Sequence, residues 1–66
     1  MRTNLKVLRV KNHFTQEQMA KEVDISYPTY AAVENGRLRG SEKFWLNVQN
    51  RFEVENSEMW ELMRNE

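Results

Sequence analysis

The sequence contains no cysteine and a single histidine, His13. Without cysteine there can be no disulfide and no thiolate metal site. One histidine cannot form a multi-histidine site, so we expect no metal ion. The sequence also shows no paired-carboxylate or nucleophile–base constellation. It therefore predicts a binding protein and not an enzyme, with no cofactor and no small-molecule substrate.

Long apolar runs are also missing. Between Leu5 and Val10 the apolar residues are interrupted by Lys6 and Arg9. No segment has the length and apolarity of a membrane span or a secretory signal. We therefore expect a cytoplasmic protein that has no membrane partner. Because 66 residues are too few to bury two separate cores, we predict one domain over residues 1–66.

The net charge is zero, but the charges separate along the chain. Through Phe44 there are eight basic and five acidic residues, and from Trp45 onward there are two basic and five acidic ones. A basic N-terminal part followed by an acidic C-terminal part fits a protein that binds phosphates on one side. A solvated surface of mixed charge explains the same distribution almost as well.

Local signals predict helices throughout the chain. The first helix is expected over about residues 4–12, with Thr3 or Asn4 as its N-cap. Thr15 and Gln18 have the spacing of a capping box, which predicts the start of a second helix.

The remaining helices have equally local signals. Ser26 is expected to cap a third helix with Pro28 in its first turn and Gly36 just beyond its end. Ser41 is expected to cap a fourth helix, and a fifth is expected over about residues 56–63. With no strand signal, these elements predict an all-α, five-helix fold. The expected core residues are Met19, Val23, Val33, Trp45, Val48 and Phe52.

Three segments resemble one known family. They are Thr15–Ala20 (TQEQMA), Ile25–Ser26, and Glu34–Gly36 (ENG). Together they are similar to the Cro/CI-type (XRE-family) helix-turn-helix of phage and bacterial transcription regulators. The resemblance extends to a Leu-Arg pair at residues 8–9 and to Phe-Glu-Val at residues 52–54, where the family has Leu-Gly-Val. It implies a compact, lambda-repressor-like DNA-binding domain with its helix-turn-helix at residues 15–36 in the second and third helices.

The resemblance also implies which residues meet double-stranded DNA. Gln16 corresponds to a glutamine that contacts phosphate or a base edge. Residues 27–29 and 31–32 correspond to the first two turns of the recognition helix, and two arginines beyond it approach the flanking phosphates. The implied DNA-binding residues are Gln16, Tyr27, Pro28, Thr29, Ala31, Ala32, Arg37 and Arg39.

The recognition helix departs from the family at its reading positions. Typical members place Arg, Lys, Asn or Gln there, because these side chains make bidentate contacts to guanine or adenine. Here none of the reading positions carries such a side chain. One interpretation is a repressor-like regulator that reads operator DNA through apolar and shape contacts. The other is a small antirepressor or modulator that binds a partner repressor protein through the same face. We favour DNA.

Three further features bear on the structure of this domain. Arg9 and Glu34 match a family pair that joins the first helix to the recognition helix, although they could be unrelated surface charges. His13 and Asp24 stand where the family commonly has glycine, and we expect Asp24 to adopt the left-handed conformation there. Three apolar residues lie next to the helix faces that carry the expected core residues. They either extend the core or form a homodimer contact through the last helices. These residues are Phe44, Leu46 and Met63.

Overall fold

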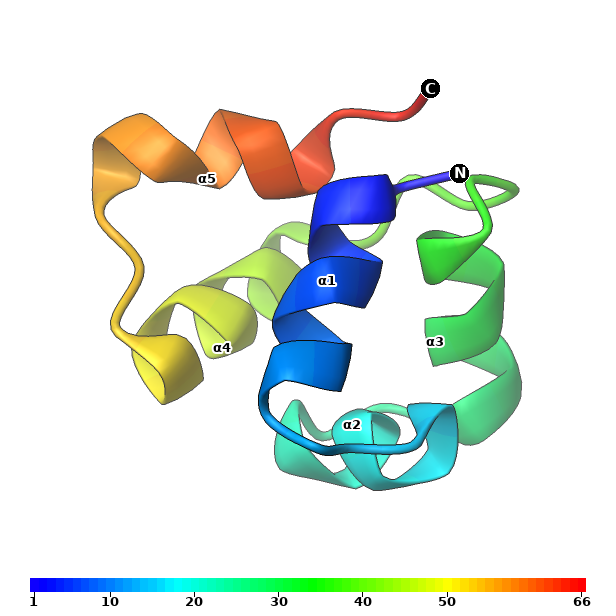
Figure 1. The fold of residues 1–66 in the computed structure, drawn as a ribbon. Coiled ribbons are helices and arrows are strands. Elements are labelled where there is room, and N and C mark those ends of the chain that lie inside the picture. The colour runs from blue at the N-terminus through cyan, green and yellow to red at the C-terminus, as the bar shows by residue number, and fades with distance from the viewer.

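The computed structural model covers residues 1–66 and contains five α-helices and no strand, as predicted. The helices are α1 (Thr3–Lys11), α2 (Gln16–Glu22), α3 (Tyr27–Glu34), α4 (Glu42–Phe52) and α5 (Asn56–Met63). In Figure 1, α2 lies below α1, α3 stands beside it, and α5 crosses the top of the molecule. None of the five helices is long and apolar enough to span a lipid bilayer.

Side-chain caps start α2, α3 and α4 where the sequence predicts them. The Thr15 hydroxyl accepts from the backbone amide of Gln18, and the Gln18 side chain accepts from the Thr15 amide. Ser26 and Ser41 likewise accept from the amides three residues further on. Each cap satisfies a donor that has no partner within its helix, so these starts depend on local sequence alone.

The predicted cap of α1 is wrong. The helix begins one residue earlier, at Thr3, with Arg2 at the N-cap position and no side-chain cap. Asn4 instead donates from Nδ2 to the backbone oxygen of Glu61 at 3.3 Å. The start of α1 is stabilised by tertiary contacts, because the backbone amide of Arg2 donates to the Glu34 oxygen at 2.8 Å.

Three residues other than glycine adopt the left-handed conformation. They are His13, Asp24 and Glu53, with φ angles of 63°, 61° and 53°. All three stand where the resembled family has glycine, and the prediction for Asp24 is confirmed. Each costs on the order of 1 kcal/mol relative to a right-handed conformation, because Cβ crowds the following carbonyl oxygen.

The core lies where the five helices meet. Five of the six predicted core residues are buried, but Phe52 is only partly buried. Its ring lies edge-on to Phe14 at a centroid distance of 6.4 Å, at the margin of the core. Phe44 belongs to the core, whereas Leu46 and Met63 are exposed.

The two chain ends meet beside the C-terminal end of α3 (Figure 1). The N-terminal ammonium of Met1 donates to Oδ1 of Asn65 at 2.8 Å and to the Glu66 oxygen at 2.9 Å. The Glu66 amide donates back to the Met1 oxygen at 2.9 Å. These bonds join the two chain ends, and Asn65 ties them to the loop after α3 by donating from Nδ2 to the Gly36 oxygen at 3.0 Å.

Candidate nucleic-acid interface

The first turn of α3 projects into solvent. Tyr27, Pro28 and Thr29 are all exposed. The Ser26 hydroxyl accepts from the Thr29 amide at 3.4 Å and donates to Oγ1 of Thr29 at 2.7 Å. Both hydroxyls are exposed and keep further hydrogen-bonding capacity toward an external group.

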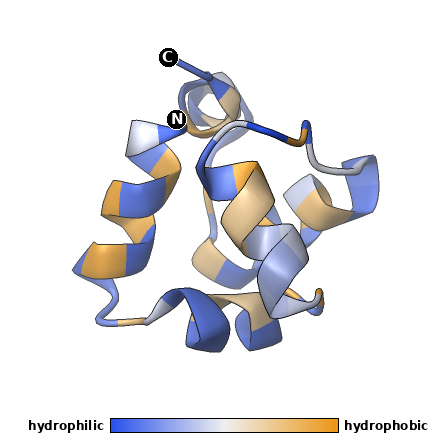
Figure 2. Cartoon of the chain, turned by 90° about the vertical axis from the view of Figure 1, so that its right-hand side faces the viewer, coloured by the Kyte–Doolittle hydropathy of each residue, from blue (hydrophilic) through white to orange (hydrophobic).

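The second turn of α3 presents little polarity. Ala31 and Ala32 are half-buried and offer only methyl groups outward. In Figure 2 the side of the molecule that carries α3 faces the viewer, and most of this helix is pale or tan, whereas most of α2 below it is blue. The face therefore suits apolar contact and single hydrogen bonds, and it holds no side chain that could make a bidentate contact to a base.

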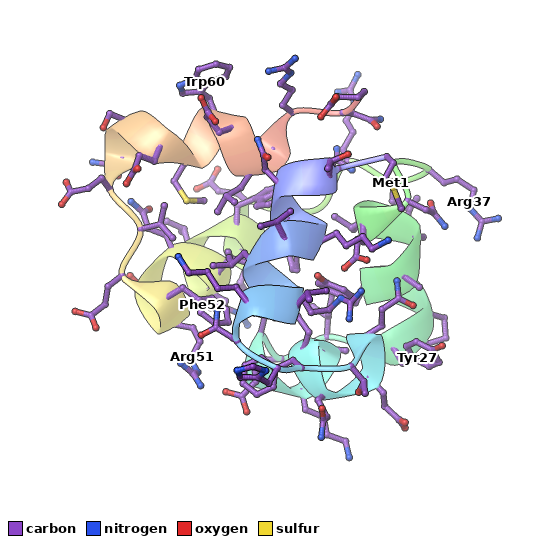
Figure 3. All side chains as sticks on the ribbon, in the orientation of Figure 1. Met1, Tyr27, Arg37, Arg51, Phe52 and Trp60 are labelled. Carbon is purple, nitrogen blue, oxygen red and sulfur yellow. The ribbon has the colours of Figure 1, made fainter.

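A loop with two exposed arginines follows α3. We call residues 35–40, which join α3 to α4, the basic loop; Arg37 and Arg39 are both exposed in it. In Figure 3, Tyr27 at the start of α3 and Arg37 just beyond its end project on the same side of the molecule. The apolar face of α3 is thus flanked by cationic side chains of the kind that bind phosphate.

Beneath α3, four side chains meet in a buried cluster around Glu34. Arg9 donates from Nε to Oε2 of Glu34 at 2.9 Å and from Nη2 to Oε1 at 3.2 Å. Tyr30 donates its hydroxyl to Oε2 at 2.6 Å, and Gln16 donates from Nε2 to Oε1 at 3.2 Å. Both oxygens of the carboxylate are therefore fully engaged. We call these four residues the Glu34 cluster.

The protonation states in this cluster follow from its geometry. Burial disfavours a charged Glu34, but the hydrogen bonds from Arg9, Tyr30 and Gln16 outweigh it and hold the pKa of Glu34 below its usual value. Burial and the neighbouring Glu34 carboxylate raise the pKa of Tyr30 far above its usual value. The hydrogen bond to Glu34 raises the pKa of Arg9 despite desolvation. Glu34 is therefore a carboxylate that accepts from a neutral tyrosine and a charged arginine.

The cluster links the three helices that make up the motif. Arg9 lies in the last turn of α1, Gln16 begins α2, and Tyr30 and Glu34 lie in α3. Arg9 also donates from Nη1 to the Phe14 oxygen at 2.8 Å, in the connection before α2. The angle between α2 and α3 is thus held by charge-assisted hydrogen bonds, which are stronger than neutral ones.

The structure divides the residues expected to bind DNA into two groups. Tyr27 and Arg37 project on the same side of the molecule, and Thr29 and Arg39 line one hollow between α3 and the basic loop. Gln16 is half-buried, and its amide nitrogen donates one hydrogen to Glu34, which leaves the second amide hydrogen and the amide oxygen for other partners. Its contact with DNA stays a prediction.

Arg2 is a residue whose role the sequence does not reveal. In the sequence it is one of eight basic residues in the N-terminal part of the chain, but in the structure it is only 5% exposed. Its guanidinium lies under the basic loop and bonds to backbone carbonyls. No sequence signal marks such a residue, because its partners are backbone groups that every residue type carries.

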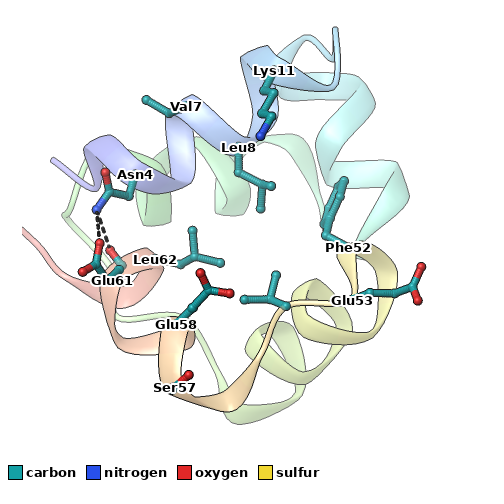
Figure 4. A pocket seen from close by; sticks show the side chains of 11 residues that line it. Asn4, Val7, Leu8, Lys11, Phe52, Glu53, Ser57, Glu58, Glu61 and Leu62 are labelled. Carbon is teal, nitrogen blue, oxygen red and sulfur yellow. Dashed lines mark hydrogen bonds between the residues drawn. The ribbon is translucent and has the colours of Figure 1, made fainter.

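The opposite side of the molecule has a different character. Figure 4 shows a groove between α1 and α5 with an apolar floor that includes Leu8, Leu62 and Phe52. Three glutamates, Glu53, Glu58 and Glu61, line it, while Lys11 is its one cationic lining residue. Carboxylates repel phosphate, so this side is unsuited to nucleic acid. Nowhere in the structure do three His, Asp or Glu side chains gather as metal ligands could.

Comparison with known proteins agrees with this geometry. The helix-turn-helix family pattern matches residues 5–40, which include all of α2 and α3 and the basic loop. An uncharacterized HTH-type transcriptional regulator from Archaeoglobus fulgidus is 32% identical over 69 aligned positions, covering 92% of this chain and 97% of that protein. No solved structure matches significantly. The family match spans more than half of the chain, and the relative aligns over nearly its whole length. This chain therefore belongs to the XRE-type helix-turn-helix family of DNA-binding transcription regulators.

Proposed function

We propose that the protein is a repressor-like, sequence-specific regulator that acts in the cytoplasm and reads the major groove of operator DNA with the outer face of α3. The observation that carries this proposal is an exposed first turn of α3 on the same side of the molecule as Arg37, with the exposed Arg39 beside Thr29. A recognition helix reads base edges from such a face, while neighbouring cations fix its register on the phosphates.

The reading chemistry follows from the side chains on that face. Tyr27, Ala31 and Ala32 offer apolar contact to thymine methyl groups, and the Thr29 hydroxyl can donate to a base or a phosphate. Affinity then depends mainly on phosphate contacts from Arg37 and Arg39, and specificity on apolar contact and DNA shape. We expect weak binding per protein chain, because few basic side chains lie near the reading face.

The test is a fluorescence-anisotropy titration with DNA from the flank of the protein's own gene and with a scrambled sequence, over a salt series. Arg37→Ala should weaken binding to both sequences alike and flatten the slope of log affinity against log salt by about one. Lys11→Ala is the charge-matched control from the opposite groove, and it should leave affinity and slope unchanged. Tyr27→Ala and Thr29→Ala should reduce the difference in affinity between the two DNA sequences without changing the salt dependence of binding. If no DNA shows salt-dependent binding, the proposal is wrong.

The alternative candidate is a small antirepressor or modulator that uses the same face against another repressor. It is favoured by the 48% exposure of Tyr27 and the 49% exposure of Leu38, together with the lack of a bidentate reader. Exposed aromatic side chains are enriched in protein interfaces. Titrating the purified repressor encoded by a neighbouring gene with this protein tests the alternative. A complex that Tyr27→Ala abolishes, in a protein that binds no DNA, would establish it.

A homodimer on paired half-sites is the remaining part of the proposal. Leu46 and Met63 are 49% and 43% exposed and line a hollow between α4 and α5, whereas the buried Phe44 offers no surface. Sedimentation equilibrium of wild type and Leu46→Glu, each with and without operator DNA, tests this contact. We expect two wild-type chains per operator and weaker pairing of the variant.

A further inference from the structure

The basic loop is held from beneath by the buried side chain of Arg2. Its Nη1 donates to the backbone oxygens of Val33 and Leu38 at 2.6 and 2.7 Å. Its Nη2 donates to the Arg39 oxygen at 3.4 Å, and its Nε donates to the Met63 oxygen at 2.9 Å. One guanidinium therefore joins the end of α3, the basic loop and the end of α5.

No carboxylate neutralises this buried cation. Val33 lies in the last turn of α3 and Met63 is the last residue of α5, so Arg2 sits at two helix C-terminal ends. The last carbonyls of a helix lack intrahelical donors and carry partial negative charge, which favours a cation. The guanidinium also lies over the Trp45 ring, 5.6 Å from its centroid. Burial lowers the pKa of Arg2, but an arginine stays charged in a protein.

Two more side chains bind the same loop. Nε1 of Trp45 donates to the Arg39 oxygen at 3.0 Å, and Nδ2 of Asn65 donates to the Gly36 oxygen at 3.0 Å. Gly40 lies so close to Trp45 that an added Cβ would stand 2.8 Å from Nε1. The loop backbone is thus fixed by groups from three parts of the chain, while the side chains of Arg37 and Arg39 remain in solvent.

We propose that Arg2 is a positioning residue for DNA binding: it fixes the backbone of the basic loop so that Arg37 and Arg39 stand beside α3 in the arrangement that meets phosphates. This inference depends on the proposed DNA-binding function. Arg2 itself makes no phosphate contact, because reaching solvent would break its bonds to four carbonyls. A loop that is ordered before binding loses less entropy when its side chains engage the ligand, and this raises affinity.

The variant that tests this is Arg2→Lys, which keeps the charge but replaces a planar fork of donors with a single ammonium group. The matched control is Asn4→Ala. Asn4 also joins α1 to α5, through the Glu61 oxygen, but it contacts no residue of the basic loop. Circular dichroism should establish that each variant is folded at the temperature of measurement.

The decisive measurement is a double-mutant cycle between Arg2→Lys and Arg37→Ala, read as affinity for DNA from the flank of the protein's own gene. We expect Arg2→Lys to weaken binding about tenfold. We also expect Arg37→Ala to cost clearly less in the Arg2→Lys background than in wild type, because the loop is then no longer in place. Asn4→Ala should change affinity less than about twofold, and its effect should add to that of Arg37→Ala.

A second readout concerns the loop itself. Backbone ¹⁵N relaxation should show residues 36–40 becoming more mobile in Arg2→Lys while the amides of α2 keep their wild-type order. If Arg2→Lys does not fold, Trp45→Phe and Asn65→Ala take its place. Each removes one donor to a loop carbonyl, and each should weaken binding and reduce the effect of Arg37→Ala.

The outcomes separate this inference from the proposed function. Additive effects of Arg2→Lys and Arg37→Ala in a protein that binds DNA would overturn the positioning role and leave the DNA-binding function standing. Unchanged loop order with unchanged affinity would do the same. Absence of DNA binding by the wild type would overturn both. Coupling together with a mobile loop supports the inference.

Discussion

The two ends of α1 each place an arginine under α3, and the two side chains have different partners. Arg9, in the last turn of α1, forms an ion pair with Glu34 at 2.9 Å. Arg2, just before α1, donates only to backbone carbonyls at the ends of two other helices and in the basic loop. One end compensates a buried cation with a side-chain charge, and the other with peptide dipoles.

The turns at the two ends differ as well. Near Arg2, the left-handed positions of the basic loop are glycines, Gly36 and Gly40, with φ angles of 92° and 81°. After the Arg9 end of α1, the connections before and after α2 place His13 and Asp24 in that region. The end that carries the exposed arginines thus has the less strained backbone. This small protein thus uses different side chains to position the basic loop and to fix α2 against α3.

The largest effect is expected from Trp45→Ala. Trp45 is 6% exposed, covers Arg2 and donates to the basic loop, so its removal should cost about 3–5 kcal/mol of unfolding free energy. In a protein this small, such a loss can abolish folding. Chemical denaturation measures the change. The matched control is Trp60→Ala, because Trp60 is 57% exposed, and its cost should stay within about 0.5 kcal/mol. Equal free energies of unfolding for the two variants would mean that Trp45 does not contribute to the core.

At the other end of α1, Arg9→Ala should cost about 2–4 kcal/mol, because it leaves the buried Glu34 carboxylate without its cation. A variant that combines Arg9→Met and Glu34→Leu with Tyr30→Phe should cost less than Arg9→Ala, because it removes both charges and also the buried Tyr30 hydroxyl that would lose its acceptor. Thermal melts of the wild type and the two variants measure the difference. An Arg9→Ala variant that melts like wild type would show that the pair does not stabilise the fold.

Acidification should test the same pair with a smaller effect, because protonation leaves both side chains in place. The folded-state pKa of Glu34 lies below its unfolded value, so its contribution to stability is complete above the unfolded pKa. That contribution is lost as the pH falls through the folded pKa. The stability difference between wild type and Glu34→Gln should therefore be constant near neutrality and shrink below about pH 4. A difference that stays constant down to about pH 2 would contradict the lowered pKa.

The smallest effect is expected at the turn between α1 and α2. His13→Gly should stabilise the fold by about 0.5 kcal/mol. Glycine adopts a φ of 63° without strain, and this gain is partly offset because glycine loses more conformational entropy on folding. Gly40→Ala should act in the opposite direction, because it adds a Cβ at φ of 81° close to Trp45. Urea denaturation of the two variants measures both changes. Changes of the same sign would mean that the two ends do not differ in backbone strain.

Local sequence determined the helices and the family of this protein. Thr15, Ser26 and Ser41 mark their helix starts because a cap joins a side chain to an amide only three residues away. The predicted fifth helix matches α5, Asn56–Met63, and the helix-turn-helix motif follows from residue types at short, fixed spacings. The link between Arg9 and Glu34 was open to prediction because both partners are charged side chains in a recognisable pattern.

Tertiary structure alone decided the contacts of Arg2 and Gln16, the burial of Phe52 and the start of α1. The hydrogen-bond partners of Arg2 lie 31, 36, 37 and 61 residues away along the chain. They are backbone carbonyls, which look alike at every position of a sequence. Only the packing of α3, α5 and the basic loop around one point selects which of them become acceptors. The same packing sets the start of α1, because the amide of Arg2 finds its acceptor in Glu34 at the end of α3.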